Sequence, residues 1–132
     1  MEIYIELDLI FDNDFDVNEI TRKTGMNPTD CKNRSETRFN PLMNKNNEGY
    51  WTLQSRVHNE YDVKIVIDEF IPLFVDHLSE IKAICDTNNG EVKFSIVPSF
   101  SSNKTPAIYF ERDFLDIVHY LNASIEIDMY VD

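Results

Sequence analysis

Residues 2–9 read EIYIELDL, and residues 125–132 read IEIDMYVD. In both stretches apolar and polar side chains alternate with a period of two, which is the pattern of a β-strand with one buried face. The expected inward positions are Ile3, Ile5, Leu7 and Leu9 in the first stretch, and Ile125, Ile127, Met129 and Val131 in the second. The expected outward positions are Glu2, Tyr4, Glu6, Asp8, Glu126, Asp128, Tyr130 and Asp132. The sequence therefore predicts one-sided strands in both stretches.

Three segments between these strands have helical patterns. The first is short, because Asp16 is suited to cap its start and Gly25 can take the left-handed conformation that ends it. The second covers about 62–85, where apolar residues recur at spacings of three and four, and Pro72 must kink it or split it. The third covers about 112–121.

Two further stretches, 50–57 and 91–100, predict strands, whereas the polar stretch 29–48 predicts a loop with short extended pieces. Strand, short helix and strand follow in the same order before residue 58 and after residue 90. We therefore predict one α+β domain over residues 1–132, built on a single mostly antiparallel sheet with helices packed on one face. Its two pseudo-repeated βαβ-like halves would be joined by the kinked helical segment.

The charge balance limits the possible partners. The chain has 12 basic and 24 acidic residues, a net charge of −12 and a pI near 4.5. Such a chain is repelled by nucleic-acid phosphates and by anionic membranes, so neither is an expected partner. The charge suits a basic protein partner, but solubility alone is the commoner reason for such a charge.

The sequence also predicts a cytoplasmic protein. Its opening residues lack the basic region of a signal peptide, and its longest apolar run, 70–75, is too short to cross a bilayer. Cys31 and Cys85 stand far apart and match no metal-binding or redox spacing, so we expect both thiols to be reduced.

No motif for catalysis, a metal or a cofactor is apparent. The acidic run 12–18 lacks the glycine and the glutamate that a calcium loop needs at its sixth and twelfth positions. The chain has neither a GxSxG motif nor a glycine-rich phosphate loop, and its three histidines are isolated. We therefore expect a non-enzymatic protein without cofactor or metal.

One set of outward residues suggests a site. If the first and last strands are neighbours, a mixed carboxylate and tyrosine surface forms from Tyr4, Glu6, Asp8, Glu126, Asp128 and Tyr130. Carboxylates steer the encounter with a basic protein, and tyrosines supply contact area. The concrete hypothesis is an immunity-type antitoxin, because small acidic domains suit the neutralisation of basic toxins. The competing interpretation is that these residues form only the solvated face of a one-sided sheet.

A second functional hypothesis places a pocket between the sheet and the helical segment. Trp51 would line this pocket, and the 29–48 loop could act as its lid. The protein would then be a small-molecule-binding or regulatory domain.

Several stretches resemble a known bacterial family. They are the turn-containing stretch 20–28 (ITRKTGMNP), the strand 49–53 (GYWTL) and the closing 121–130 (LNASIEIDMY). Together they resemble the family catalogued as domain of unknown function 4279, over nearly the whole chain. These are capping, turn and core elements, so the resemblance implies a shared fold and brings no activity or binding residues.

Overall fold

The strands of the protein form one mixed sheet. The computed structural model describes residues 1–36 and 48–132. Within this part of the chain a six-stranded sheet has the order β2-β3-β1-β4-β5, with β6 also paired to β4. The strands are β1 (Glu2–Phe11), β2 (Asp30–Lys32), β3 (Gly49–Gln54), β4 (Glu91–Phe100), β5 (Ser124–Ile127) and β6 (Tyr130–Val131). β5 and β6 run parallel to β4, and the other pairs are antiparallel.

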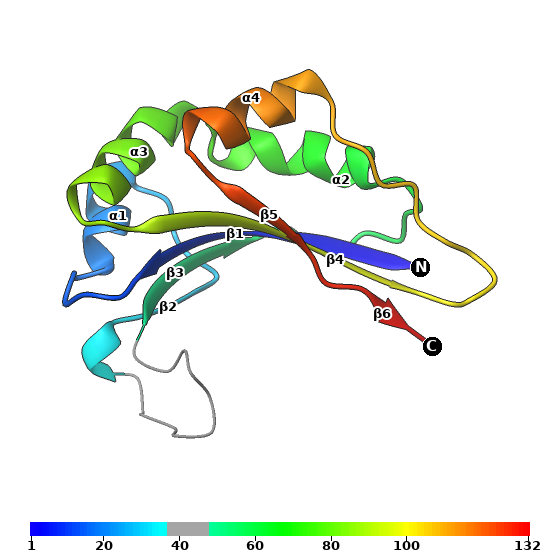
Figure 1. The fold of residues 1–132 in the computed structure, drawn as a ribbon, viewed down its shortest axis with the longest axis horizontal. Helices are drawn as coiled ribbons and strands as arrows, with labels where there is room; N and C mark the ends of the chain where they lie inside the picture. Colours follow the sequence, from blue (N-terminus) through cyan, green and yellow to red (C-terminus); the bar gives the residue numbers. More distant parts are fainter. Residues whose placement is uncertain (37–47) are drawn as a thin grey trace.

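The helices cover one face of this sheet. They are α1 (Asn18–Thr24), α2 (Val63–Phe70), α3 (Leu78–Thr87) and α4 (Arg112–Tyr120). Short 3₁₀ turns are η1 (Arg34–Glu36), η2 (Ile71–Leu73) and η3 (Val75–His77). Figure 1 shows α2, α3 and α4 on the same side of the sheet. The predicted α+β class, with a mostly antiparallel sheet, is confirmed.

The core lies between the sheet and these helices. β1 is the central strand, with β3 on one side and β4 on the other, and its inward residues Ile3, Ile5, Leu7 and Leu9 have no exposed surface. Each such residue contributes about 1.5–3 kcal/mol by its burial. The ring of Phe94 on β4 lies 5.7 Å from that of Phe74, between η2 and η3, and 5.0 Å from that of Phe114 on α4. These ring contacts pack the helical segment around Pro72 and α4 against the sheet.

Local signals mark the helix boundaries, although α1 begins one residue later than the expected cap at Asp16 allows: its N-cap is Val17, which makes no side-chain capping hydrogen bond. The Oδ1 atom of Asp16 accepts the backbone N–H of Asn18 at 3.1 Å, and α1 ends at Gly25 with φ of 75°. Asp62 caps α2 by accepting the N–H of Lys64 at 3.0 Å. The helical segment is interrupted at Pro72, as expected. α2 ends at Phe70, and Pro72 lies in the 3₁₀ turn η2 that follows it.

The closing strand differs from its prediction. It is interrupted between β5 and β6, and Ile127, Met129 and Val131 are 38%, 54% and 58% exposed rather than buried. Only Ile125 packs against the core. The prediction was wrong because alternation identifies the two faces of a strand but does not show whether a helix covers either one.

The predicted loop 29–48 lies partly outside the described residues. The stretch 29–48 contains β2 and η1, as the expected short extended pieces allow, while 37–47 lie outside the described residues. β4 and β5 form a parallel pair connected through α4, whereas β1 and β3 are antiparallel. The pseudo-repeat of the two halves stays a prediction. The longest α-helix in the described part of the chain, α3, has 10 residues, about half of what a bilayer span requires.

Candidate functional site

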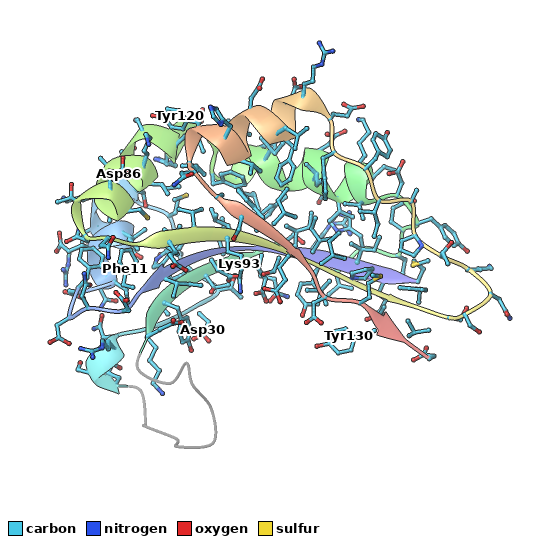
Figure 2. All side chains as sticks on the ribbon, viewed as in Figure 1. Phe11, Asp30, Asp86, Lys93, Tyr120 and Tyr130 are labelled. Carbon is cyan, nitrogen blue, oxygen red and sulfur yellow. The ribbon has the colours of Figure 1, made fainter. Side chains whose placement is uncertain are left out.

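The candidate site is the side of the sheet that faces away from the helices. The surface of interest, called the acidic face below, consists of Tyr4, Glu6, Asp8, Glu126, Asp128 and Tyr130. β1 and β5 are not neighbours, because β4 lies between them, so the condition under which this surface was proposed is not met directly. The residues still share one face, since Ser95 of β4 stands opposite both Glu6 and Glu126 in the sheet register. Figure 2 shows Tyr130 on the side away from α2 and α4.

Asp8 is a buried member of the acidic face. Only 7% of its surface is exposed. Its Oδ1 atom accepts the hydroxyl of Thr52 at 2.8 Å, and its Oδ2 atom accepts the hydroxyl of Ser95 at 3.0 Å. The expectation of a solvated carboxylate was wrong here, because β3 and β4 enclose the side chain of the central strand from both sides. Both carboxylate oxygens nevertheless have a donor, as a buried charge requires.

Glu6 is strongly perturbed by its surroundings. Burial, the charge of Asp8, a hydrogen bond with Asp8 and the charge of Asp128 together raise the pKa of Glu6 to about 7, against an opposing effect of Lys93. Desolvation and like charges both disfavour the ionised carboxylate. At neutral pH Glu6 is therefore partly protonated, unlike an ordinary surface glutamate.

The two tyrosines border this carboxylate cluster. Burial first, and then the neighbouring negative charges, raise the pKa of Tyr4 above its usual value. The hydroxyl of Tyr130 donates to Oδ2 of Asp128 at 3.1 Å, and this hydrogen bond raises the pKa of Tyr130. Both phenols are consequently neutral near pH 7, and each presents an aromatic ring with a polar tip.

A comparison with protein families gives a match over the whole chain, which includes the residues of the acidic face. The family model of a domain of unknown function (DUF4279) matches residues 1–132. The chain belongs to the DUF4279 family. No curated protein and no solved structure matches it. Membership in DUF4279 supplies no assigned activity, so the function must be argued from the site.

Sequence reasoning missed several members of this surface in the DUF4279 chain. The Nζ atom of Lys93 lies 3.0 Å from Oε2 of Glu126, so a cation sits within the carboxylate cluster. Tyr50 donates its hydroxyl to Oδ2 of Asp30 at 3.0 Å, further along the same face. Alternation already placed Lys93 outward, but only the strand order shows that β4 runs through the middle of the acidic face.

Trp51, the residue expected to line a pocket, belongs to the core. Its side chain is fully buried, and its Nε1–H donates to Oγ1 of Thr21 at 3.1 Å. A cavity of about 500 Å³ lies at the end of the sheet near the C-terminal ends of α3 and α4, and Trp51 does not line it. A second cavity of about 390 Å³ lies between α2 and α4, again away from Trp51.

The described residues of this DUF4279 chain hold no ready metal site. Among residues 1–36 and 48–132, no group of three or more His, Cys, Asp and Glu side chains could hold a metal ion.

Proposed function

We propose that this DUF4279 protein is a non-enzymatic binding protein whose acidic face engages a basic protein. The concrete case is an immunity-type antitoxin that neutralises a basic toxin. The single observation that carries the proposal is the crowding of Glu6 with Asp8 and Asp128, which, together with burial, holds the pKa of Glu6 at about 7. The partial protonation of Glu6 marks a place where a further positive charge is favourable.

An incoming arginine or lysine would relieve this crowding. A positive charge next to Glu6 favours its ionised form, so binding would lower the pKa of Glu6 and release a proton. Tyr4 and Tyr130 would supply rigid contact area around the charged centre. The net charge of −12 would accelerate the encounter over a long range, and salt would weaken it.

A catalytic role for Glu6 is less well supported. A pKa near 7 would suit a general acid, but such chemistry also needs a substrate held against the carboxyl group. Neither of the two cavities described above is lined by Glu6. We therefore infer that the raised pKa serves binding of charge.

The test is affinity capture with two matched variants. Glu6→Gln with Asp128→Asn replaces two carboxyl groups of the acidic face with amides, and Asp76→Asn with Asp116→Asn does the same at two exposed positions on the helical side. At low salt the wild type and the helical-side variant should capture a basic protein, whereas the acidic-face variant should bind that protein, once purified, at least about tenfold more weakly. About 0.5 M salt should release it.

Three results would count against the proposal. The first is that no basic protein is captured at low salt. The second is that the acidic-face variant binds the purified protein as tightly as the helical-side variant does. The third is binding that ignores salt, since contacts between exposed charges are screened over about a Debye length.

The second candidate is a small-molecule-binding or regulatory domain. The cavity of about 500 Å³ gives this alternative a location, and the carboxylates of Asp86 and Glu91 in its lining favour a small organic cation. Titration with spermidine followed by amide chemical shifts tests it. Shifts centred on Asn89 and Asn122 would favour the cavity, and shifts centred on Glu6 would favour the acidic face.

A further inference from the structure

The outer edge of β5 and β6 is unusual for the edge of a sheet. β5 is the last strand in the sheet order, so no strand of the described residues pairs with its outer side. Natural edges are usually protected by lysines, prolines or covering loops. Here the large side chains of Ile127, Met129, Tyr130 and Val131 are all exposed, by 38–58%. In Figure 1 β5 and β6 run toward the C-terminus along this open edge.

The backbone of this edge is a template for a further strand. The N–H of Asp128 donates to the carbonyl of Ile96 at 2.9 Å, and the N–H of Asp132 donates to the carbonyl of Phe100 at 3.0 Å. In a parallel pair, alternate residues direct both backbone groups to the same neighbour. The N–H and C=O groups of Met129 and Val131 therefore face away from β4.

The side chains along the edge separate into two rows of different chemistry. By alternation, Ile127, Met129 and Val131 form an apolar row on the helical side of the sheet. The other row, on the side of the acidic face, contains Asp128 and Asp132. A strand that paired with this edge would match both rows if its apolar and basic residues alternated.

Two kinds of strand could pair with this edge: a strand from a second copy of this chain and a strand from a basic protein. Charge favours the basic protein. A second copy of this chain would bring another net charge of −12, and carboxylates of both copies would lie side by side along the paired edge strands. Like charges on adjacent strands are destabilising. A basic segment instead places opposite charges along Asp128 and Asp132, next to the acidic face.

We propose that the free edge of β5 and β6 pairs with an extended segment of the basic partner, in which apolar and basic residues alternate. This inference rests on the proposed function and adds how the partner docks: backbone hydrogen bonds from Met129 and Val131 hold the segment, while the acidic face binds its charges.

The experiment uses a capped peptide of about eight residues that alternates valine and arginine, and the same peptide N-methylated at every residue. The methylated peptide keeps its charge and apolar side chains but cannot donate backbone hydrogen bonds. Hydrogen exchange of the protein amides is followed while each peptide is added at low salt. The unmethylated peptide should slow exchange at Met129 and Val131 at least about tenfold at saturation and bind at least about tenfold more tightly than the methylated one.

A lysine at the edge provides the matching protein variant. Val131→Lys should weaken binding of the unmethylated peptide, because an edge lysine repels basic strands. Val57→Lys makes the same charge change at another exposed valine, 48% exposed, and should bind the peptide as the wild type does.

The outcomes separate the two proposals. If both peptides bind equally, with salt-sensitive shifts at Tyr4 and Glu6, the edge inference is overturned and the proposed function stands. If neither peptide binds at low salt, both are overturned. If Met129 and Val131 become protected in the protein alone as its concentration rises, a second copy occupies the edge and the inference is wrong.

Discussion

Replacing Glu6 with glutamine should stabilise the protein increasingly as the pH rises above about 4.5. In the folded protein the pKa of Glu6 is raised from 4.5 to about 7, chiefly by burial and then by Asp8. Below pH 4.5 the carboxyl group is protonated in the folded and unfolded states alike. Between pH 4.5 and 7 the unfolded chain releases a proton that the folded chain retains, so the free energy of unfolding falls as the pH rises.

The size of this effect follows from the shift. A change from 4.5 to about 7 corresponds to at most about 3 kcal/mol, and because Glu6 is only half-buried, solvent screening makes the actual loss of stability above pH 7 smaller than this. The Glu6→Gln variant has no such titration. Any other effect of the substitution on the free energy of unfolding does not depend on pH. The difference in free energy of unfolding between Glu6→Gln and the wild type should therefore be up to about 3 kcal/mol larger at pH 8 than at pH 4.

Urea denaturation at several pH values measures this difference. Glu2→Gln, at the exposed end of the same strand, controls for the loss of one negative charge. The account of the acidic face is refuted if the difference between Glu6→Gln and the wild type is the same at pH 4 and pH 8. A direct NMR titration of the Glu6 carboxyl group with a midpoint near 4.5 would refute it as well.

Three other substitutions or modifications test the fold. His58→Ala should lower the free energy of unfolding by about 2 kcal/mol in urea, because the buried ring has its Nε2 atom 2.6 Å from Oε2 of Glu69; an unchanged midpoint contradicts this. Gly90→Ala should cost about 1–3 kcal/mol and lower the melting temperature, since its Cβ atom would clash with the ring of Phe11; a neutral result would show that the ring moves aside freely. Burial raises the pKa of Cys85 to about 12, so its thiol should resist a thiol reagent at pH 8 until urea is added, and prompt labelling of the native protein would argue against this packing.

The local features of the fold could be predicted from the sequence because they are encoded locally. Alternation identified the inward row of β1, where Leu7 and its neighbours are fully buried. Pro72 marked the break after α2, and Gly25 marked the end of α1. Each of these outcomes depends on residues only a few positions apart.

The neighbours of each strand could not be predicted in the same way. Alternation placed Asp8 on the outer face, but its burial comes from the central position of β1 between β3 and β4. It placed Val131 on the inner face, but no helix of the described residues buries this side chain, which is 58% exposed. Lys93 entered the site for the same reason, since its role depends on β4 lying between the strands of the acidic face.

Proton release on binding of a cation is the most direct test of the acidic face. A hexa-arginine peptide is titrated into the protein at pH 7 in two buffers that differ in their enthalpy of ionisation. Because the pKa of Glu6 is about 7, the account predicts release of up to about half a proton per bound peptide from Glu6, and none from Glu6→Gln. Binding heats that are the same in both buffers for the wild type would contradict it.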